Sequence, residues 1–201
     1  MALKKCKLLL LTLMISFLLT SCSGIQMFTD SDADIHAKIH KRYSDMKSYA
    51  ADVKITVKSN KTENVYTAKQ FFSEPDTMSV EFNESGTLYL IKNGMAVLKK
   101  GENELSFPAA NSINYLFINE FFKLYYTSQD TAITVSSDEV LSVTRLETEL
   151  IGSTSKRNSA VLTVNNKTLS PERLVIYDFG KNPVIEVDFL SFIYNAKSEN
   201  F

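Results

Sequence analysis

Hydrophobic residues recur with two different periods along the chain, and the change of period sets the predicted architecture. The first stripe is spaced by four, four and three residues: Ile35, Ile39, Tyr43 and Met46. This spacing predicts an amphipathic helix. The residues before it supply N-cap candidates and negative charge at the helix start: Asp30, Ser31, Asp32 and Asp34. From Ala51 onward the period is two, which predicts strands.

The alternating segments continue almost to the end of the chain. The first covers 51–58, with Val53, Ile55 and Val57 on one face. The later predicted strands cover 65–72, 78–82, 87–92, 95–100, 105–107, 133–136, 140–149, 160–164, 174–178 and 185–192. Asn93-Gly94 is the strongest short hairpin signal among the turns between them. The order of strands and turns predicts an α+β, mainly β domain with an antiparallel sheet.

One segment, 112–126, interrupts the strands. It has 15 residues, is strongly apolar and contains neither Gly nor Pro, so its length favours a helix. Apolar side chains lie on nearly all sides of that helix, which predicts burial on more than one face.

The N-terminus has the pattern of a bacterial lipoprotein signal. Three lysines precede an uncharged run of 12 residues, 8–19. The run is shorter than the roughly 20 residues of a membrane-spanning helix and suits a signal peptide. It ends in Leu19-Thr20-Ser21-Cys22, which resembles a lipobox, so Cys22 is the predicted lipidation site. The alternatives are an uncleaved anchor, or a plain signal peptide with a chance cysteine.

This interpretation divides the chain into a signal peptide over 1–21, a lipid-anchored tether over 22–34 and one domain over 35–201. The mature chain then carries 19 basic and 23 acidic residues and a net charge of -4. That balance argues against nucleic-acid binding. Cys6 leaves with the signal and Cys22 carries lipid, so no free thiol remains for catalysis or a disulfide. The expected location is the extracytoplasmic face of the cell membrane.

Familiar catalytic motifs are absent from the sequence. His36 and His40 share one face of the predicted helix and could share a metal, but neither a HExxH pattern nor a third ligand accompanies them. Histidines at the rim of an amphipathic helix explain the pair better. Two SxxK matches, 44–47 and 153–156, lack the companion motifs of penicillin-binding enzymes. Carboxylate pairs such as Glu147 and Glu149 fit a solvated strand face. We therefore expect no enzyme activity, no metal and no cofactor.

An open, curved antiparallel sheet has an apolar concave face that a helix or a ligand must cover. Alternation assigns eight residues to this face as candidate cavity-lining positions, with ordinary core as the alternative: Val53, Ile55, Val57, Val80, Phe82, Ile185, Val187 and Phe189.

Three stretches resemble the LolA/LolB lipoprotein-carrier superfamily. They are the opening helix and strand over 35–57, the strand, proline and strand unit over 71–82, and the late proline-preceded hairpin over 169–189. The resemblance covers most of 35–192. It implies an open half-barrel of about 11 strands with helices packed in its concave face. The chain departs from these carriers because 77–82 lacks their Arg and Trp, and the whole sequence has no Trp.

Within the superfamily, a lipid-anchored chain rich in Lys, Asn and Tyr is similar to the GerS-type germination lipoproteins of clostridia. That resemblance implies a non-enzymatic lipoprotein that binds a CwlD-like N-acetylmuramoyl-L-alanine amidase of the spore cortex. Unpaired sheet edges would also allow a homodimer. A lipid or lipoprotein carrier is the alternative, and a hydrolase that uses His36 and His40 is the third hypothesis.

Overall fold

The computed structural model describes residues 30–59, 61–109, 113–127, 135–138, 142–154 and 156–197. The chain divides into two units, Met1–Ala33 and Asp34–Phe201. Only the last four residues of the first unit are described, and they open a helix. The signal peptide, Cys22 and most of the tether lie outside the described residues, so those predictions and the domain boundaries stay predictions. Among the described residues, no helix is both long and apolar enough to cross a bilayer.

The first helix, α2, covers Asp30–Ser44 and begins five residues before the apolar stripe. Ile39, Tyr43 and Met46 are buried, as the spacing predicted. Met46 lies just beyond the last helical residue, where the chain turns into the first strand.

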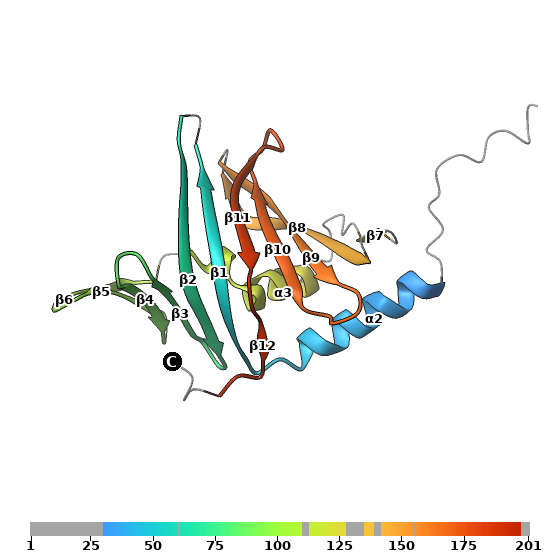
Figure 1. Ribbon diagram of the computed structural model, residues 1–201, viewed down its shortest axis with the longest axis horizontal. Helices are drawn as coiled ribbons and strands as arrows, with labels where there is room; N and C mark the ends of the chain where they lie inside the picture. The colour runs from blue at the N-terminus through green and yellow to red at the C-terminus, as the bar shows by residue number, and fades with distance from the viewer. Residues whose placement is uncertain are drawn as a thin grey trace, which may run out of the picture. The chain divides into compact units, whose positions relative to one another are not determined.

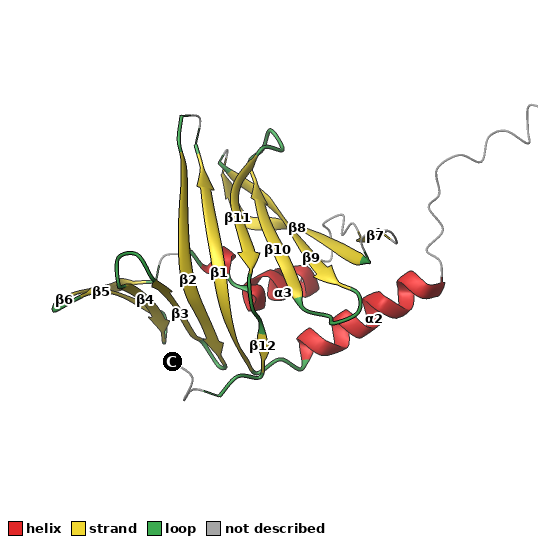
Figure 2. Ribbon diagram, viewed as in Figure 1, coloured by secondary structure: helices red, strands yellow, loops and turns green. Residues whose placement is uncertain are grey.

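The strands form one antiparallel sheet, drawn in yellow in Figure 2. They are β1 (Ser48–Lys58), β2 (Glu63–Ser73), β3 (Thr77–Phe82), β4 (Thr87–Lys92), β5 (Met95–Lys100), β6 (Asn103–Pro108), β7 (Val135–Asp138), β8 (Val143–Thr154), β9 (Arg157–Asn165), β10 (Pro171–Tyr177), β11 (Pro183–Phe189) and β12 (Ile193–Tyr194). The order is β6-β5-β4-β3-β2-β1-β11-β10-β9-β8-β7, and the short β12 pairs with β1. The path ends at β6 and β7 without closing. The predicted α+β, mainly β class and the open antiparallel half-barrel are therefore confirmed.

Local turn chemistry fixes the β4–β5 hairpin. Asn93 and Gly94 both have positive φ, at 52° and 72°, as the two central residues of a type I′ turn require. Lys92 then faces Met95 across the pair. The hairpin predicted from the Asn-Gly dipeptide is confirmed.

The prediction of a single helix over 112–126 is wrong in one respect. A 3₁₀ turn, η1, covers Asn114–Leu116, and the α-helix α3 covers Ile118–Thr127. Phe117 between them is extended, with φ -100° and ψ 137°. The expected burial on more than one face is also only partly met, since full burial is confined to one stripe of α3: Ile118, Phe121, Phe122 and Tyr125.

The remaining differences concern strand ends. β8 reaches Thr154 although the sequence predicted an end near 149, and β6 covers six residues where three were predicted. The strand predicted over 185–192 ends at Phe189, and the chain re-enters the sheet as β12. Backbone pairing with neighbouring strands extends β8 and β6 beyond the residues that alternation marks.

Candidate functional site

The eight predicted lining residues share one face of the sheet, here called the inner face. Val53 lies opposite Phe189, Ile55 opposite Val187 and Val57 opposite Ile185. The same face continues through β2 to Val80 and Phe82 on β3. Four of the eight are almost fully buried: Val53, Ile55, Val80 and Val187. The other four are half-buried and pack against the same hydrophobic cluster.

The inner face is covered by the chain's own helix α3, which lies behind β10 and β11 in the view of Figure 1. Phe117, Ile118, Phe121 and Phe122 belong to the same hydrophobic cluster as the buried sheet residues. The predicted lining residues are thus core residues in this structure. Contact between a ligand and the four half-buried lining residues stays a prediction.

Two buried polar side chains, Gln70 and Tyr49, hold the junction of η1 and α3 on the inner face. This pair is here called the bracket. Gln70 and Tyr49 are both fully buried. Gln70 Nε2 donates to the carbonyl oxygen of Leu116 at 3.2 Å, and its Oε1 accepts a hydrogen bond from the Tyr49 hydroxyl at 3.3 Å. The Ile118 N–H donates to the same hydroxyl oxygen at 3.3 Å.

The bracket explains why the predicted helix breaks at Phe117. The extended Phe117 directs the carbonyl before it and the N–H after it toward the sheet. There they meet side-chain partners instead of helical ones, so both backbone groups are satisfied in the core. Burial also raises the pKa of Tyr49, so its hydroxyl stays protonated and available as a donor.

Aromatic contacts join the two helices. Tyr43 of α2 stacks on Phe122 of α3, with ring centroids 4.2 Å apart. His36 Nε2 lies 2.8 Å from the Tyr125 hydroxyl. His40 packs against the Tyr126 ring at 4.5 Å, and the Tyr126 hydroxyl donates to the His40 carbonyl oxygen. The two histidines therefore lie at the α2–α3 contact, as the rim interpretation predicted, and each faces a tyrosine.

Half-burial of His36 predicts a weak pH dependence of stability. Desolvation, with a smaller contribution from nearby His40, lowers the pKa of His36 below 6.5. The unfolded chain then binds the proton more readily, so stability is lost as pH falls below about 6.5 and through the lowered pKa. We expect urea unfolding between pH 7 and 5 to show a smaller fall in the free energy of unfolding for His36→Gln than for the wild type. Equal falls would contradict this assignment.

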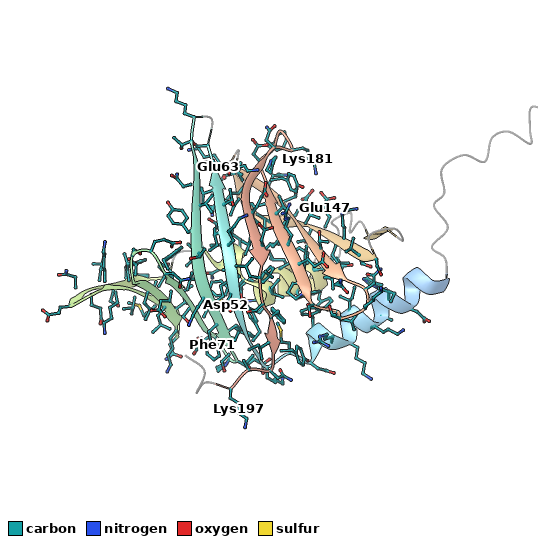
Figure 3. All side chains as sticks on the ribbon, in the orientation of Figure 1. Asp52, Glu63, Phe71, Glu147, Lys181 and Lys197 are labelled. Atoms are coloured by element: carbon teal, nitrogen blue, oxygen red, sulfur yellow. The ribbon has the colours of Figure 1, made fainter. Side chains whose placement is uncertain are left out.

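The outer face of the sheet is charged. Lys58 pairs with Glu186, Arg173 with Asp188, and Lys54 Nζ lies 3.4 Å from Asp188 Oδ2. The hydrogen bond to Glu186 raises the pKa of Lys58. Near the β10–β11 turn, Lys181 Nζ lies 3.0 Å from Glu147 Oε1 (Figure 3). These partly exposed pairs are typical of a sheet face that borders solvent, and each contributes little stability.

Where the structure describes their side chains, the other candidate motifs do not assemble into catalytic groups, and Ser153 of the match over 153–156 lies outside the described side chains. Ser44 Oγ donates to the Lys41 carbonyl, while Lys47 pairs with Glu74 at 2.9 Å, so this SxxK match brings no serine to its lysine. Glu147 is held by Lys181, and Glu149 is exposed. Within the part of the chain that the structure describes, no group of three His, Cys, Asp or Glu residues could hold a metal ion.

Sequence reasoning missed the exposed apolar side chains. Phe179 is 77% exposed at the β10–β11 turn, and Leu105 is 60% exposed on the edge strand β6. Leu190 and Ile193 are also largely exposed, before and within β12. Alternation marks such residues as core candidates, and only the order of the described strands shows that β6, with Leu105, lies at the end of the sheet. These positions offer contact area to a partner.

Comparison with known families decides where the chain belongs. Its sequence matches the family described as "Sporulation protein YdcC-like" over residues 4–201. The chain belongs to this sporulation family. No curated protein sequence matches it.

Solved structures agree with the fold. A chain from the structure of the CwlD amidase from Clostridioides difficile in complex with the GerS lipoprotein is 23% identical, with a TM-score of 0.50 over 85% of this chain and 99% of that chain. An uncharacterized conserved protein from Thermus thermophilus is 13% identical, with a TM-score of 0.49 over 85% and 91%. A LolA superfamily protein from Nitrosomonas europaea is 11% identical, with a TM-score of 0.45 over 86% and 97%. The predicted resemblance to LolA-like and GerS-type proteins is confirmed at the level of the fold.

Proposed function

We propose that the chain is a non-enzymatic lipoprotein that binds and supports a spore-cortex N-acetylmuramoyl-L-alanine amidase. In this role it serves cortex modification during spore formation, and hence germination. The observation that carries the proposal is the half-barrel itself, whose inner face is filled by its own α3 while a sheet edge and several apolar side chains are exposed. The family is a sporulation family, and one similar fold comes from the complex of the CwlD amidase with the GerS lipoprotein.

The arrangement of polar groups favours binding over catalysis. The buried polar side chains Gln70 and Tyr49 bond each other and the backbone of η1 and α3. The charged residues named above pair with one another on the outer face, partly exposed to solvent. A general acid or base needs a pKa tuned by a sheltered site, whereas these groups are arranged to hold the fold.

A partner can be supported by binding alone. If the chain binds the folded, active conformation of an amidase more tightly than other conformations, mass action increases the active population. Lipidation at Cys22 would place this event on the extracytoplasmic face of the membrane or in the spore envelope, with the acyl chains providing the attachment.

Co-purification tests the binding step. The domain over 35–201 and the cortex amidase of the same organism, expressed together with a tag on one of them, should elute as one complex of fixed stoichiometry. Elution of the two proteins at their separate sizes would reject the proposal.

A lipid carrier is the second candidate, favoured by the half-buried inner-face residues Val57, Phe82, Ile185 and Phe189. Native mass spectrometry separates the two functions. The amidase partner predicts the mass of the chain alone, whereas a carrier would keep bound acyl lipid.

A further inference from the structure

The outward backbone groups of the edge strand β6 follow from its register. Ala109 N–H donates to the Gly94 carbonyl oxygen at 2.9 Å, continuing the register of β5 and β6. Successive residues of a strand direct their backbone groups to opposite sides, so the odd-numbered residues of β6 bond to β5. Glu104 and Ser106 therefore direct their N–H and C=O groups away from the sheet. Figure 1 shows β6 at the free margin of the sheet.

The edge is short and has a defined end. Glu104 and Ser106 are exposed, and Pro108 has no N–H to offer. Among the described residues no strand pairs with this side of β6, which thus presents two donors, at Glu104 and Ser106, with carbonyl acceptors beside them. An extended peptide that adds one strand would satisfy these groups.

One row of side chains on the inner face is incomplete at this edge. Val80, Tyr89, Leu98 and Leu105 lie opposite one another in successive strands. Their exposure rises along the row: Val80 is fully buried, Tyr89 is 8% exposed, Leu98 is half-buried and Leu105 is 60% exposed. An apolar side chain beside Leu105 would continue the row and bury it.

The neighbouring row on the outer face holds two pairs of opposite charge. Lys69 lies opposite Glu81 and Lys99 opposite Glu104, with the neutral Leu88 between the two pairs. Opposite charges directly across a strand pair stabilise the pair, so the position beyond Glu104 suits a lysine or arginine.

We propose that β6 pairs with an extended segment of a partner protein that places an apolar residue beside Leu105 and a basic residue beside Glu104. The inference rests on the proposed function, in which the chain acts by binding a protein. A second copy of β6 fits less well, because Asn103–Pro108 contains no lysine or arginine to face Glu104.

Peptides test this edge on the whole folded domain. The probes are a short peptide of alternating valine and lysine and a matched peptide with glutamate in place of lysine. The readouts are fluorescence anisotropy of the labelled peptides and amide chemical shifts of β5 and β6. Ser106→Pro removes one outward N–H from an edge position, and Ser106→Ala keeps it. Glu104→Lys reverses the charge without touching the backbone.

We expect the lysine peptide to bind the wild type more tightly than the glutamate peptide, with shifts centred on β6. Ser106→Pro should weaken binding by about tenfold, Ser106→Ala should not, and Glu104→Lys should reverse the preference between the peptides. Peptide binding that is unchanged by both Ser106→Pro and Glu104→Lys would overturn the inference. So would sedimentation showing that Ser106→Pro only dissociates a dimer of this chain.

Measuring amidase binding and peptide binding side by side separates this inference from the proposed function. Equal amidase binding by wild type and Ser106→Pro, with no peptide bound at β6, would overturn the inference and leave the proposed function intact. Peptide binding with the expected dependence, but no amidase complex, would reject the proposed partner and leave the edge site intact.

Discussion

Replacing Phe122 by alanine is expected to lower the free energy of unfolding by about 4 kcal/mol. Phe122 is 3% exposed, stacks on Tyr43 of α2 and meets Phe121 edge-to-face at 5.5 Å. Its removal leaves a cavity between the two helices and the inner face, and a loss of this size is a large fraction of the stability of a single domain. The urea midpoint, fitted with the slope of the transition, measures it.

Lys123→Ala is the matched control, since Lys123 is the next residue of α3 and is largely exposed. We expect that substitution to change stability by less than about 0.5 kcal/mol. If Phe122→Ala behaved like Lys123→Ala, α3 would not be packed in the core as the structure describes.

Replacing Gln70 by alanine should cost about 3 kcal/mol, because it removes buried volume and also leaves two polar groups without their partners. The Leu116 carbonyl loses its donor, and the Tyr49 hydroxyl loses its acceptor. Hydrogen exchange gives a local readout: the Ile118 amide, bonded to the Tyr49 hydroxyl, should exchange faster.

Lys69→Ala is the control for Gln70, because Lys69 is the preceding residue of β2 and lies on the exposed outer face. Little change in stability or exchange is expected there. Slow exchange of the Ile118 amide in Gln70→Ala would show that the bracket does not hold α3.

Much of this fold could be predicted because its local signals agree with its tertiary structure. The stripe of α2, the alternation of β1 and the Asn93-Gly94 turn each depend on neighbours close in sequence. The break at Phe117 could not be predicted in this way. It depends on Tyr49 and Gln70, which lie far away in sequence and meet the break only after the sheet forms.

The candidate site, too, could be predicted only in part from the sequence. Alternation identified the inner face correctly, because the side-chain period of a strand is two. It could not show that α3 fills this face, since that depends on how a distant helix docks. Nor could it show that Leu105 ends a row at a free edge, because strand order is a property of the whole sheet.

We infer, above all, that this half-barrel acts by what it binds and leaves bond cleavage to its partner. The deciding experiment follows the release of peptide stems from purified spore-cortex peptidoglycan by the amidase, with increasing amounts of this domain. We predict no release by the domain alone and a rise in amidase activity that saturates at a fixed ratio of the two proteins. Amidase activity that is unchanged by the domain, or cleavage by the domain without amidase, would contradict this inference.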